Sequence, residues 1–253
     1  YGAMELASLG GKAVAADLEG ALSEVAKHRP AMDEVFARLA VEHGVCILGP
    51  SGPVFTGNRP VNRATLFGPE GVLGHQDKQI MTRFEREDWE VVPGEDGLEL
   101  FKTPAGNLGV VICYDSEFPL LSRHLAEAGV EILLAPSCTE AEAGYWRVRV
   151  GAMARALENQ CAVVHAPLVG KAPWCAGVEE NTGAAGVYGP MDWGWPSNGI
   201  LALGEMNAPG WTLATVSRAL IARTREDGGV LNYRHWSEQD ARLARGKRHD
   251  DAS

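Results

Sequence analysis

The spacing of apolar and polar residues changes along the chain and divides it into expected helices and strands. Residues 1–41, rich in alanine, leucine and glutamate, predict helix, with Pro30 between two periodic segments. Residues 62–78 predict two strands joined by a Gly-Pro-Glu-Gly turn. Further short apolar runs are typical of buried strands. These runs cover residues 44–50, 108–115, 130–136 and 161–168.

Two helices are expected between the later strands. Pro119 suits the first turn of a helix that Gly129 ends. Residues 145–160 predict an amphipathic helix. Its expected apolar side consists of Trp146, Val150, Met153, Ala154 and Leu157. The order strand, helix, strand, helix, strand predicts an α/β fold with covered sheets.

The remaining segments predict loops, late strands and a tail. Residues 81–96 are polar and acidic without a clear period, which predicts an ordered loop. Residues 199–204 and 211–217 predict two later strands around a turn. Residues 236–253 are charged and lack an apolar face, which is typical of a tail or an arm that orders on a partner. No repeat or linker interrupts the rest, so one domain is expected over residues 1–235.

Composition excludes several classes of function. The 253 residues include 23 basic and 33 acidic side chains, a net charge of −10. Nucleic-acid binding and polybasic membrane binding both require a basic surface, so neither is expected. No apolar run approaches the length of about 18 residues that spans a bilayer. The five cysteines form no Cys-x-x-Cys pair, and no signal-like segment opens the chain, which together favour a reduced, cytoplasmic setting.

Cys113 is the first candidate for chemistry. It ends a predicted buried strand and precedes a predicted helix, a turn at which backbone N–H groups can face a developing oxyanion. A free cysteine is more often a small core residue, and the other four cysteines lie in apolar strands or loops. A nucleophilic thiolate also needs a base or a cation nearby. None of the seven histidines lies in a sequence context typical of a cysteine protease. Lys78 is therefore the more informative candidate for the cation, although a lone lysine is usually a surface group.

Three segments carry a resemblance to a known family. GNLGVVICYDSEFP, VEILLAPS and YWRVRVGAMARALENQCAVVHA together resemble the nitrilase superfamily of carbon–nitrogen hydrolases. The resemblance extends from the first residues to about Trp236. It implies a four-layer α-β-β-α sandwich, a homodimer or larger homo-oligomer, and a Glu-Lys-Cys catalytic set. The reaction implied is hydrolysis of an amide or nitrile through a thioester or thioimidate on the cysteine.

The resemblance assigns roles to individual residues. Cys113 matches the nucleophile, and Lys78 matches the lysine whose ammonium stabilises the oxyanion. The backbone N–H of Tyr114 would be the second oxyanion donor. Many members carry a further glutamate between the lysine and the cysteine, and Glu87 is the best match by its distance from Pro93-Gly94. Because this loop varies in length, Glu85 and Glu90 are alternatives, and all three are equally typical of a solvated acidic loop.

Two positions depart from the family pattern. The general-base glutamate ends an early strand in a Phe-Pro-Glu context, and the opening YGAMELAS resembles the residues just after it. We therefore expect that glutamate, with the first strand and helix, upstream of Tyr1. Glu5 lies in a helical segment and is no substitute. The alternative is a shortened, non-catalytic binding or scaffold protein. Near Cys113, Glu117 and Leu120 replace the family's frequent arginine and glutamate, which predicts a different substrate environment, although Glu117 also suits a helix start.

Aromatic residues are the remaining candidates for a substrate pocket. Tyr145 and Trp146 are expected to contact the substrate, and Trp174, Trp193 and Trp195 are weaker candidates because tryptophans in loops more often pack on the domain. An amidase is favoured over a nitrilase, and acyl transfer to an amine is a further possibility. No phosphate-binding glycine loop, dinucleotide motif or metal-ligand spacing is present, so no cofactor or metal is expected.

Overall fold

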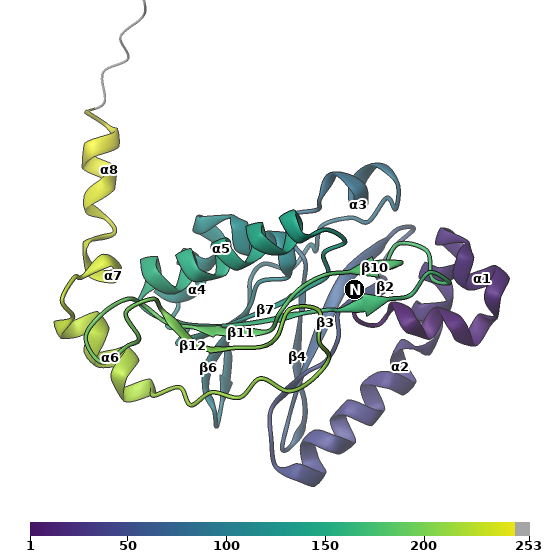
Figure 1. Cartoon of the computed structure of the whole chain (residues 1–253), viewed down its shortest axis with the longest axis horizontal. Helices are drawn as coiled ribbons and strands as arrows, with labels where there is room; N and C mark the ends of the chain where they lie inside the picture. Colours follow the sequence, from purple (N-terminus) through teal and green to yellow (C-terminus); the bar gives the residue numbers. More distant parts are fainter. Residues whose placement is uncertain (246–253) are drawn as a thin grey trace, which may run out of the picture.

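The computed structural model describes residues 1–245 and has an α/β architecture built on two sheets (Figure 1). The first sheet is antiparallel, with strand order β1-β3-β2 and β4 paired to the long strand β3. Its strands are β1 (Ile47–Leu48), β2 (Gly52–Phe55), β3 (Pro60–Gly68) and β4 (Gly71–Asp77). The hairpin predicted over residues 62–78 is therefore confirmed as β3 and β4.

The second sheet has six strands in the order β12-β11-β8-β7-β6-β5. Its centre is parallel, because β6, β7 and β8 pair in the same direction, and its flanks are antiparallel. The strands are β5 (Phe101–Thr103), β6 (Gly106–Val110), β7 (Ile132–Ser137), β8 (Ala162–Pro167), β11 (Gly186–Tyr188) and β12 (Ile200–Leu203). A short separate hairpin joins β9 (Gly170–Lys171) to β10 (Glu180–Asn181).

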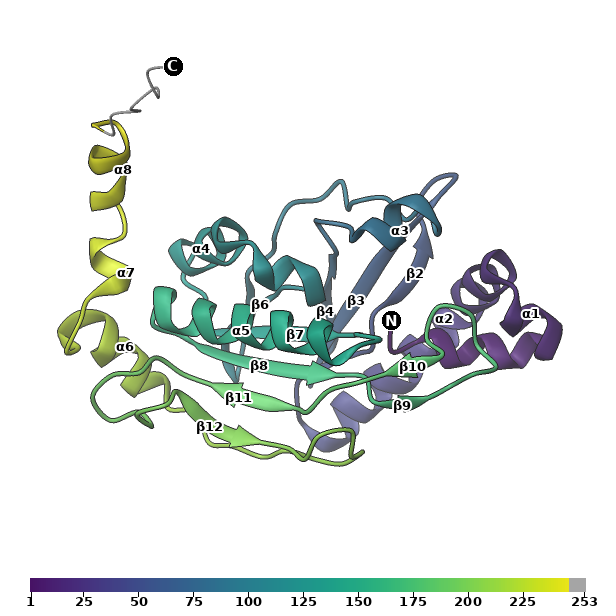
Figure 2. The same cartoon turned by 45° about the horizontal axis from the view of Figure 1, so that its top comes forward.

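Helices cover the outer faces of the two sheets (Figure 2). Helix α2 (Leu18–His43) packs on the first sheet, and α4 (Pro119–Glu127) and α5 (Glu142–Asn159) cover the second. Between the sheets, Ala64 and Leu66 of β3 share an apolar core with strand β6. The alternate residue Thr65 faces the other way, and Arg29 of α2 bonds to it at 3.1 Å. This layering confirms the predicted α/β fold.

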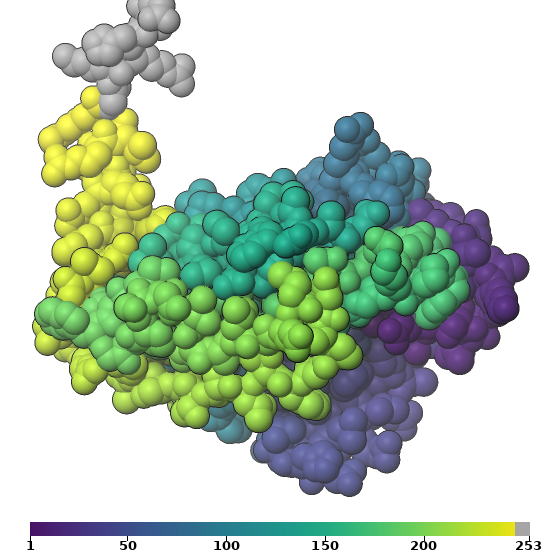
Figure 3. Space-filling view, viewed as in Figure 1, coloured from purple at the N-terminus to yellow at the C-terminus, as the bar shows by residue number. Residues whose placement is uncertain are grey.

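Shorter helices connect these layers. They are η1 (Met4–Gly10), α1 (Lys12–Ala16), α3 (Arg83–Glu87), η2 (Cys113–Glu117), α6 (Arg218–Asp227), α7 (Asn232–His235) and α8 (Glu238–Leu243). Helix α8 projects from the body of the protein (Figure 3), whereas α7 packs against α5 and α6. The tail predicted from residue 236 thus contains a helix without a buried side chain, and Arg123 stacks over Trp236 at 4.9 Å. Residues 246–253 of that predicted tail lie outside the described residues.

Several predicted elements differ from the structure. Helix α2 continues through Pro30, although the proline removes one backbone hydrogen bond of the helix. Buried residues before and after Pro30 pack the helix against the protein and hold it together. The loop predicted over residues 81–96 contains α3, and residues 211–217 form no strand. Although residues 211–217 alternate apolar and polar positions, Trp211 is 94% exposed, so no sheet covers this segment.

The predicted apolar side of α5 is also wrong. The structure exposes Trp146 and Val150, which were expected on the buried face. The helix instead buries Tyr145, Val148 and Ala152 against the second sheet. Because consecutive helical residues point about 100° apart, moving the buried face by one residue changes which aromatic side chain enters the protein.

Candidate active site

Cys113 lies where strand β6 ends and the 3₁₀ turn η2 begins. Its φ angle is +52°, a left-handed conformation that is uncommon for a residue with a side chain. The turn is held by the Ser116 hydroxyl, which donates to the Cys113 carbonyl at 2.7 Å. The Sγ of Cys113 approaches the carbonyl oxygen of Cys138 at 3.7 Å. This geometry turns a half-buried thiol out of the sheet, as the sequence predicted.

Asp115 joins the cysteine turn to the segment that follows β4. Its fully buried carboxylate accepts hydrogen bonds from the backbone N–H groups of Ile80 at 2.8 Å, Gln79 at 3.2 Å and Ile112 at 3.3 Å. Burial raises the pKa of Asp115 to about 6, against the opposing effects of these amides and of Lys78. Asp115 therefore fixes the position of Cys113 relative to Lys78, the residue just before Gln79.

Lys78 and Glu85 form a buried ion pair beside the cysteine. The Nζ of Lys78 lies 2.5 Å from Oε2 of Glu85, and the two side chains are 2% and 3% exposed. Oε2 also accepts from the backbone N–H and the hydroxyl of Thr82, each at 2.8 Å. The other oxygen, Oε1, accepts from the Tyr1 hydroxyl at 2.8 Å. The carboxylate is thus hydrogen-bonded through both of its oxygens.

The electrostatics of the pair keep both members charged. Burial acts to lower the pKa of Lys78, but the neighbouring Cys113, Glu85 and Asp115 outweigh it, and the pKa is raised. Burial likewise acts to raise the pKa of Glu85, and the ion pair with Lys78 outweighs it, so that pKa is lowered. Lys78 is therefore a fixed positive charge next to the thiol.

The structure gives Glu85, rather than Glu87, the position beside the lysine. Thr82 caps helix α3, and the side chain of Glu85 at the third helical position turns back to the Thr82 N–H. Two residues later Glu87 points to solvent, where it pairs with Arg83 at 2.7 Å and is 58% exposed. Glu90 is also exposed and pairs with Arg59 at 3.3 Å. Of the three candidates, Glu85 is the one that contacts Lys78, and the preferred match, Glu87, lies away from the lysine.

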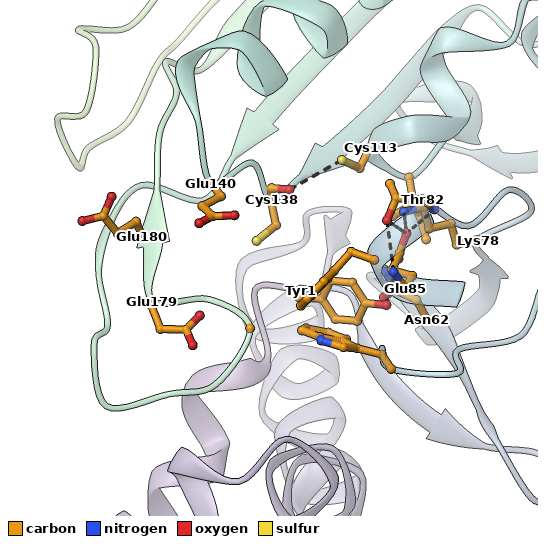
Figure 4. Close-up of a pocket in the computed structure, with 14 residues that line it drawn as sticks. Tyr1, Asn62, Lys78, Thr82, Glu85, Cys113, Cys138, Glu140, Glu179 and Glu180 are labelled. Carbon is orange, nitrogen blue, oxygen red and sulfur yellow. Dashed lines mark hydrogen bonds and ion pairs between the residues drawn. The ribbon is translucent and has the colours of Figure 1, made fainter. Parts of the chain in front are cut away.

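These residues surround a cavity of about 400 Å³ (Figure 4). Cys113, Lys78 and Glu85 lie on one side of it, and Glu140 and Glu179 lie on the other. The floor includes Trp89, whose indole ring packs against Gly177. A Cβ at Gly177 would overlap that ring, and the φ angle of +84° there also favours glycine. A second cavity of about 570 Å³ shares Cys113 and Glu140 with the first.

Comparison with known proteins now assigns the family. The family model described as carbon-nitrogen hydrolase matches residues 10–190. The chain belongs to the carbon–nitrogen hydrolase family. This result confirms the resemblance to the nitrilase superfamily that the cysteine motif indicated.

Individual relatives agree with the family assignment. The chain is 34% identical over 196 residues to "Probable hydrolase YhcX" of Bacillus subtilis, a match that covers 78% of this chain and 38% of that protein. It is 44% identical over 88 residues to deaminated glutathione amidase of Rattus norvegicus, covering 34% of this chain and 26% of that protein. The chain thus spans well under two thirds of the length of either relative.

A solved structure shares the fold. The carbon-nitrogen hydrolase from Helicobacter pylori G27 superposes with a TM-score of 0.71 at 18% sequence identity. The match covers 93% of this chain and 82% of that one. At this level of identity the likeness concerns the fold of the family member alone.

The residues predicted near the nucleophile fall into two groups. Tyr114 and Glu117 line the second cavity together with Cys113. Glu117 lies 3.7 Å from Arg147, and burial raises its pKa despite the opposing charges of Arg147 and Lys78. Tyr145 and Trp146 line neither cavity. Tyr145 is fully buried, with its ring 5.8 Å from that of His165, and Trp146 lies on the outer surface of α5.

The weaker aromatic candidates also lie elsewhere. Trp195 packs in a core with Ile221, Trp193 lines a different hollow, and Trp174 is exposed. Three aromatic residues that were not predicted line the first cavity, Tyr1, Phe84 and Trp89. Phe84 and Trp89 belong to the acidic segment predicted as a loop, where Phe84 directly precedes Glu85 and Trp89 follows four residues later.

Residues 1–245 contain no cluster of three His, Cys, Asp or Glu side chains arranged to hold a metal ion. No helix in the same residues combines the length and the apolar character that a membrane crossing requires. All five cysteines lie within them, and none is in a disulfide. Among these residues, no carboxylate hydrogen-bonds to the Sγ of Cys113, and the upstream glutamate stays a prediction.

Proposed function

We propose that this protein hydrolyses carbon–nitrogen bonds of small amides, with Cys113 as the nucleophile. The observation that carries the proposal is the gathering of Cys113, Lys78 and Glu85 around one cavity, with the lysine and glutamate buried as an ion pair. The family of carbon–nitrogen hydrolases supports the reaction class. The name of the rat relative, an amidase, supports an amide in preference to a nitrile.

The reaction has two stages. The sulfur of Cys113 attacks the amide carbonyl carbon, the carbon–nitrogen bond breaks, and the thiol proton leaves with the nitrogen as ammonia or an amine. A thioester remains on Cys113. Water then adds to the thioester carbon, the carbon–sulfur bond breaks, and a proton from that water restores the thiol as the acid is released. The net reaction is an amide plus water giving an acid plus an amine.

Lys78 stabilises the negative charge that develops within each stage. Each tetrahedral intermediate carries an oxyanion, and an ammonium held in a buried site stabilises it more than water does. The backbone N–H of Tyr114, in the first turn after the nucleophile and therefore free of a helical partner, is the second donor. Glu85 is a positioning residue, because it holds the ammonium in place and keeps it charged.

The test is turnover of a panel of short amides and nitriles, measured by ammonia release, with mass spectrometry of the intact protein to detect the thioester. We expect hydrolysis of at least one amide, an added acyl mass on the protein and loss of both in Cys113→Ala. Activity that survives Cys113→Ala would overturn the proposal. A faster reaction with the nitrile than with the matching amide would contradict the preference for amides.

The second candidate is a non-catalytic binding or scaffold role. Its support is that no carboxylate in residues 1–245 hydrogen-bonds to Cys113 and so none is in place to accept the thiol proton. Binding of an amide without any ammonia release would favour it. The homo-oligomer implied by the family stays a prediction, and sedimentation showing only a monomer across micromolar concentrations would contradict it.

A further inference from the structure

We propose that the cavity selects amides that carry a protonated amine, and that Glu140 and Glu179 are the residues that set this preference. The inference rests on the proposed amidase function, because it names the substrate class of the same cavity. The side of the cavity that faces Cys113 has no part in the catalytic roles described above.

Glu140 and Glu179 come from different parts of the chain and meet across one space. Glu140 follows strand β7, and Glu179 immediately precedes β10. Both line the first cavity, and Figure 4 shows their carboxylates turned toward the space between them and Cys113. Within residues 1–245 neither carboxylate has a hydrogen-bond or ion-pair partner. Glu140 also lines the second cavity, so a molecule reaching Cys113 from either side passes this carboxylate.

The cavity has no positive side chain left to balance these two carboxylates. Lys78 is the cationic side chain in its lining, among the described residues, and Glu85 already neutralises it at 2.5 Å. In the second cavity, Arg83 and Arg147 pair with Glu87 and Glu117, respectively. The side chains around the thiol therefore carry a net negative charge, and a hollow lined by side chains of one sign concentrates ligands of the opposite sign.

A second observation points to a ligand rich in N–H donors. Asn62 lines the same cavity and is 1% exposed, yet its Oδ1 has no hydrogen-bond partner in residues 1–245. A buried acceptor without a donor is costly, and in native proteins such atoms are nearly always satisfied. An amide or ammonium nitrogen of a bound substrate would supply the missing donor. Asn62 lies next to the catalytic lysine, because its carbonyl accepts from the Lys78 N–H at 2.9 Å.

The experiment compares three amides that differ only at the far end of the chain. They are 6-aminohexanamide, its uncharged isostere heptanamide, and the carboxylate-terminated adipamate. We expect kcat/KM for the cationic amide to exceed that for heptanamide by about tenfold at low ionic strength, with adipamate the poorest. The preference should shrink as salt rises from about 0.01 M to about 1 M, because both carboxylates are solvent-exposed and are screened.

Variants assign the preference to residues. Glu140→Gln and Glu179→Gln should each reduce the ratio of kcat/KM for 6-aminohexanamide over heptanamide by about fivefold, with little change for heptanamide. Glu142→Gln is the matched control. It removes the same charge two residues from Glu140, but its carboxylate bonds to Trp146 Nε1 at 3.3 Å and lines neither cavity. The control should leave the ratio unchanged.

The outcomes separate this inference from the proposed function. Equal kcat/KM for the three amides, a preference for adipamate, or an equal loss of the ratio in Glu142→Gln overturns the role of Glu140 and Glu179 while the amidase reaction stands. If no amide is hydrolysed, the proposed function fails instead. Calorimetric binding of 6-aminohexanamide and heptanamide to the parent protein then decides the charge preference on its own, and equal affinities overturn it.

Discussion

Lys78 and His165 are both buried basic side chains, but they have opposite charge states. Lys78 directly follows strand β4, and His165 lies within strand β8. Lys78 is 2% exposed and His165 is 1% exposed. Burial alone acts to lower the pKa of each, because it penalises the charged form. Lys78 nevertheless has a raised pKa, whereas the pKa of His165 is lowered to about 4. The same degree of burial thus gives a cation in one place and a neutral ring in the other.

The difference lies in the partners. Lys78 contacts the carboxylate of Glu85, which is itself held by Thr82 and Tyr1. His165 meets the hydroxyl of Ser137 at 2.8 Å, and its Nδ1 has no partner in residues 1–245. The nearby Arg149 lowers its pKa further. Of these two buried basic side chains, the one that contacts a carboxylate stays charged, and it lies beside the nucleophile.

Removing Lys78 should have the largest effect on both turnover and stability. Lys78→Ala should reduce turnover about a hundred- to thousandfold, through loss of an oxyanion donor. It should also lower the free energy of unfolding by about 3–5 kcal/mol, because Glu85 is left as an unpaired buried charge. Ammonia release and urea unfolding measure the two effects.

The double variant Lys78→Ala/Glu85→Gln separates the loss of turnover from the loss of stability. It should recover stability, since no buried charge remains, but no turnover. Parental activity in a folded Lys78→Ala protein would show that the lysine is not part of the chemistry.

Removing the carboxylate alone should make Lys78 resemble His165. In Glu85→Gln, burial is no longer offset, so the pKa of Lys78 should fall and the high-pH limit of activity should move to lower pH. The free energy of unfolding should drop by about 3–5 kcal/mol. Glu87→Gln is the matched control two residues away, exposed and paired with Arg83, and should behave like the parent. A pH–rate profile that stays unchanged in Glu85→Gln would contradict the positioning role.

The neutral histidine should make the protein sensitive to acid. Unfolded His165 takes up a proton below about pH 6.5, whereas the folded form resists until about pH 4, so its contribution to stability is lost as pH falls through that window. Between about pH 6.5 and about pH 5 this loss is about 2 kcal/mol. Urea unfolding at the two pH values should show a correspondingly smaller difference in His165→Gln. An identical difference in both proteins would mean that His165 is not neutral when folded.

A carboxylate placed beside His165 should raise the pKa of that histidine. Ser137→Asp would bring a carboxylate to the 2.8 Å contact with His165 Nε2. An adjacent opposite charge raises the pKa of a histidine by about 1–3. An NMR titration of the His165 ring protons measures this directly, with Ser137→Asn as the uncharged control. A pKa that stays near 4 would show that burial and Arg149 dominate even with a carboxylate present.

The smallest effect expected is a difference in thiol reactivity. Cys113 should react with iodoacetamide before the other cysteines, because it lines a cavity together with the buried ammonium of Lys78, and a neighbouring cation favours reaction of a thiol. Burial raises the pKa of Cys161 to about 12 and of Cys175 to about 11, and it also raises that of Cys138. Peptide mapping after brief labelling identifies the modified residue. Faster labelling of Cys46 or Cys138 would argue against the assignment of Cys113.

The sequence predicted the parts of the fold and site that local patterns determine. The parallel strands around Cys113 are short apolar runs, and the order of strands and helices is enough to predict their layering. Cys113 and Lys78 each lie next to a strand end, so their positions follow once those strands are recognised. The position of Glu85 could also be predicted from the sequence. Thr82 and Glu85 have the spacing of a capping box, which directs the glutamate back to the start of its helix.

Other features depend on packing between distant segments. Helix α5 carries apolar residues on more than one side, so its pattern does not say whether Tyr145 or Trp146 enters the core. The alternation in residues 211–217 is typical of a strand, but no neighbouring strand pairs with it. Glu140 and Glu179 become neighbours only through the arrangement of β7 and the β9–β10 hairpin, and no spacing along the chain brings them together.

The contact between Gly177 and Trp89 has a consequence for engineering this cavity. Since residue 177 has no room for even a methyl group and has a left-handed backbone, its position is closed to libraries of substitutions. Diversity has to be introduced instead at Trp89, the side chain that packs against this glycine. Replacing Trp89 with a smaller aromatic or aliphatic residue would widen the cavity toward bulkier substrates without disturbing the hairpin that carries Glu179. One glycine thus directs which side of the cavity a directed-evolution campaign can reshape.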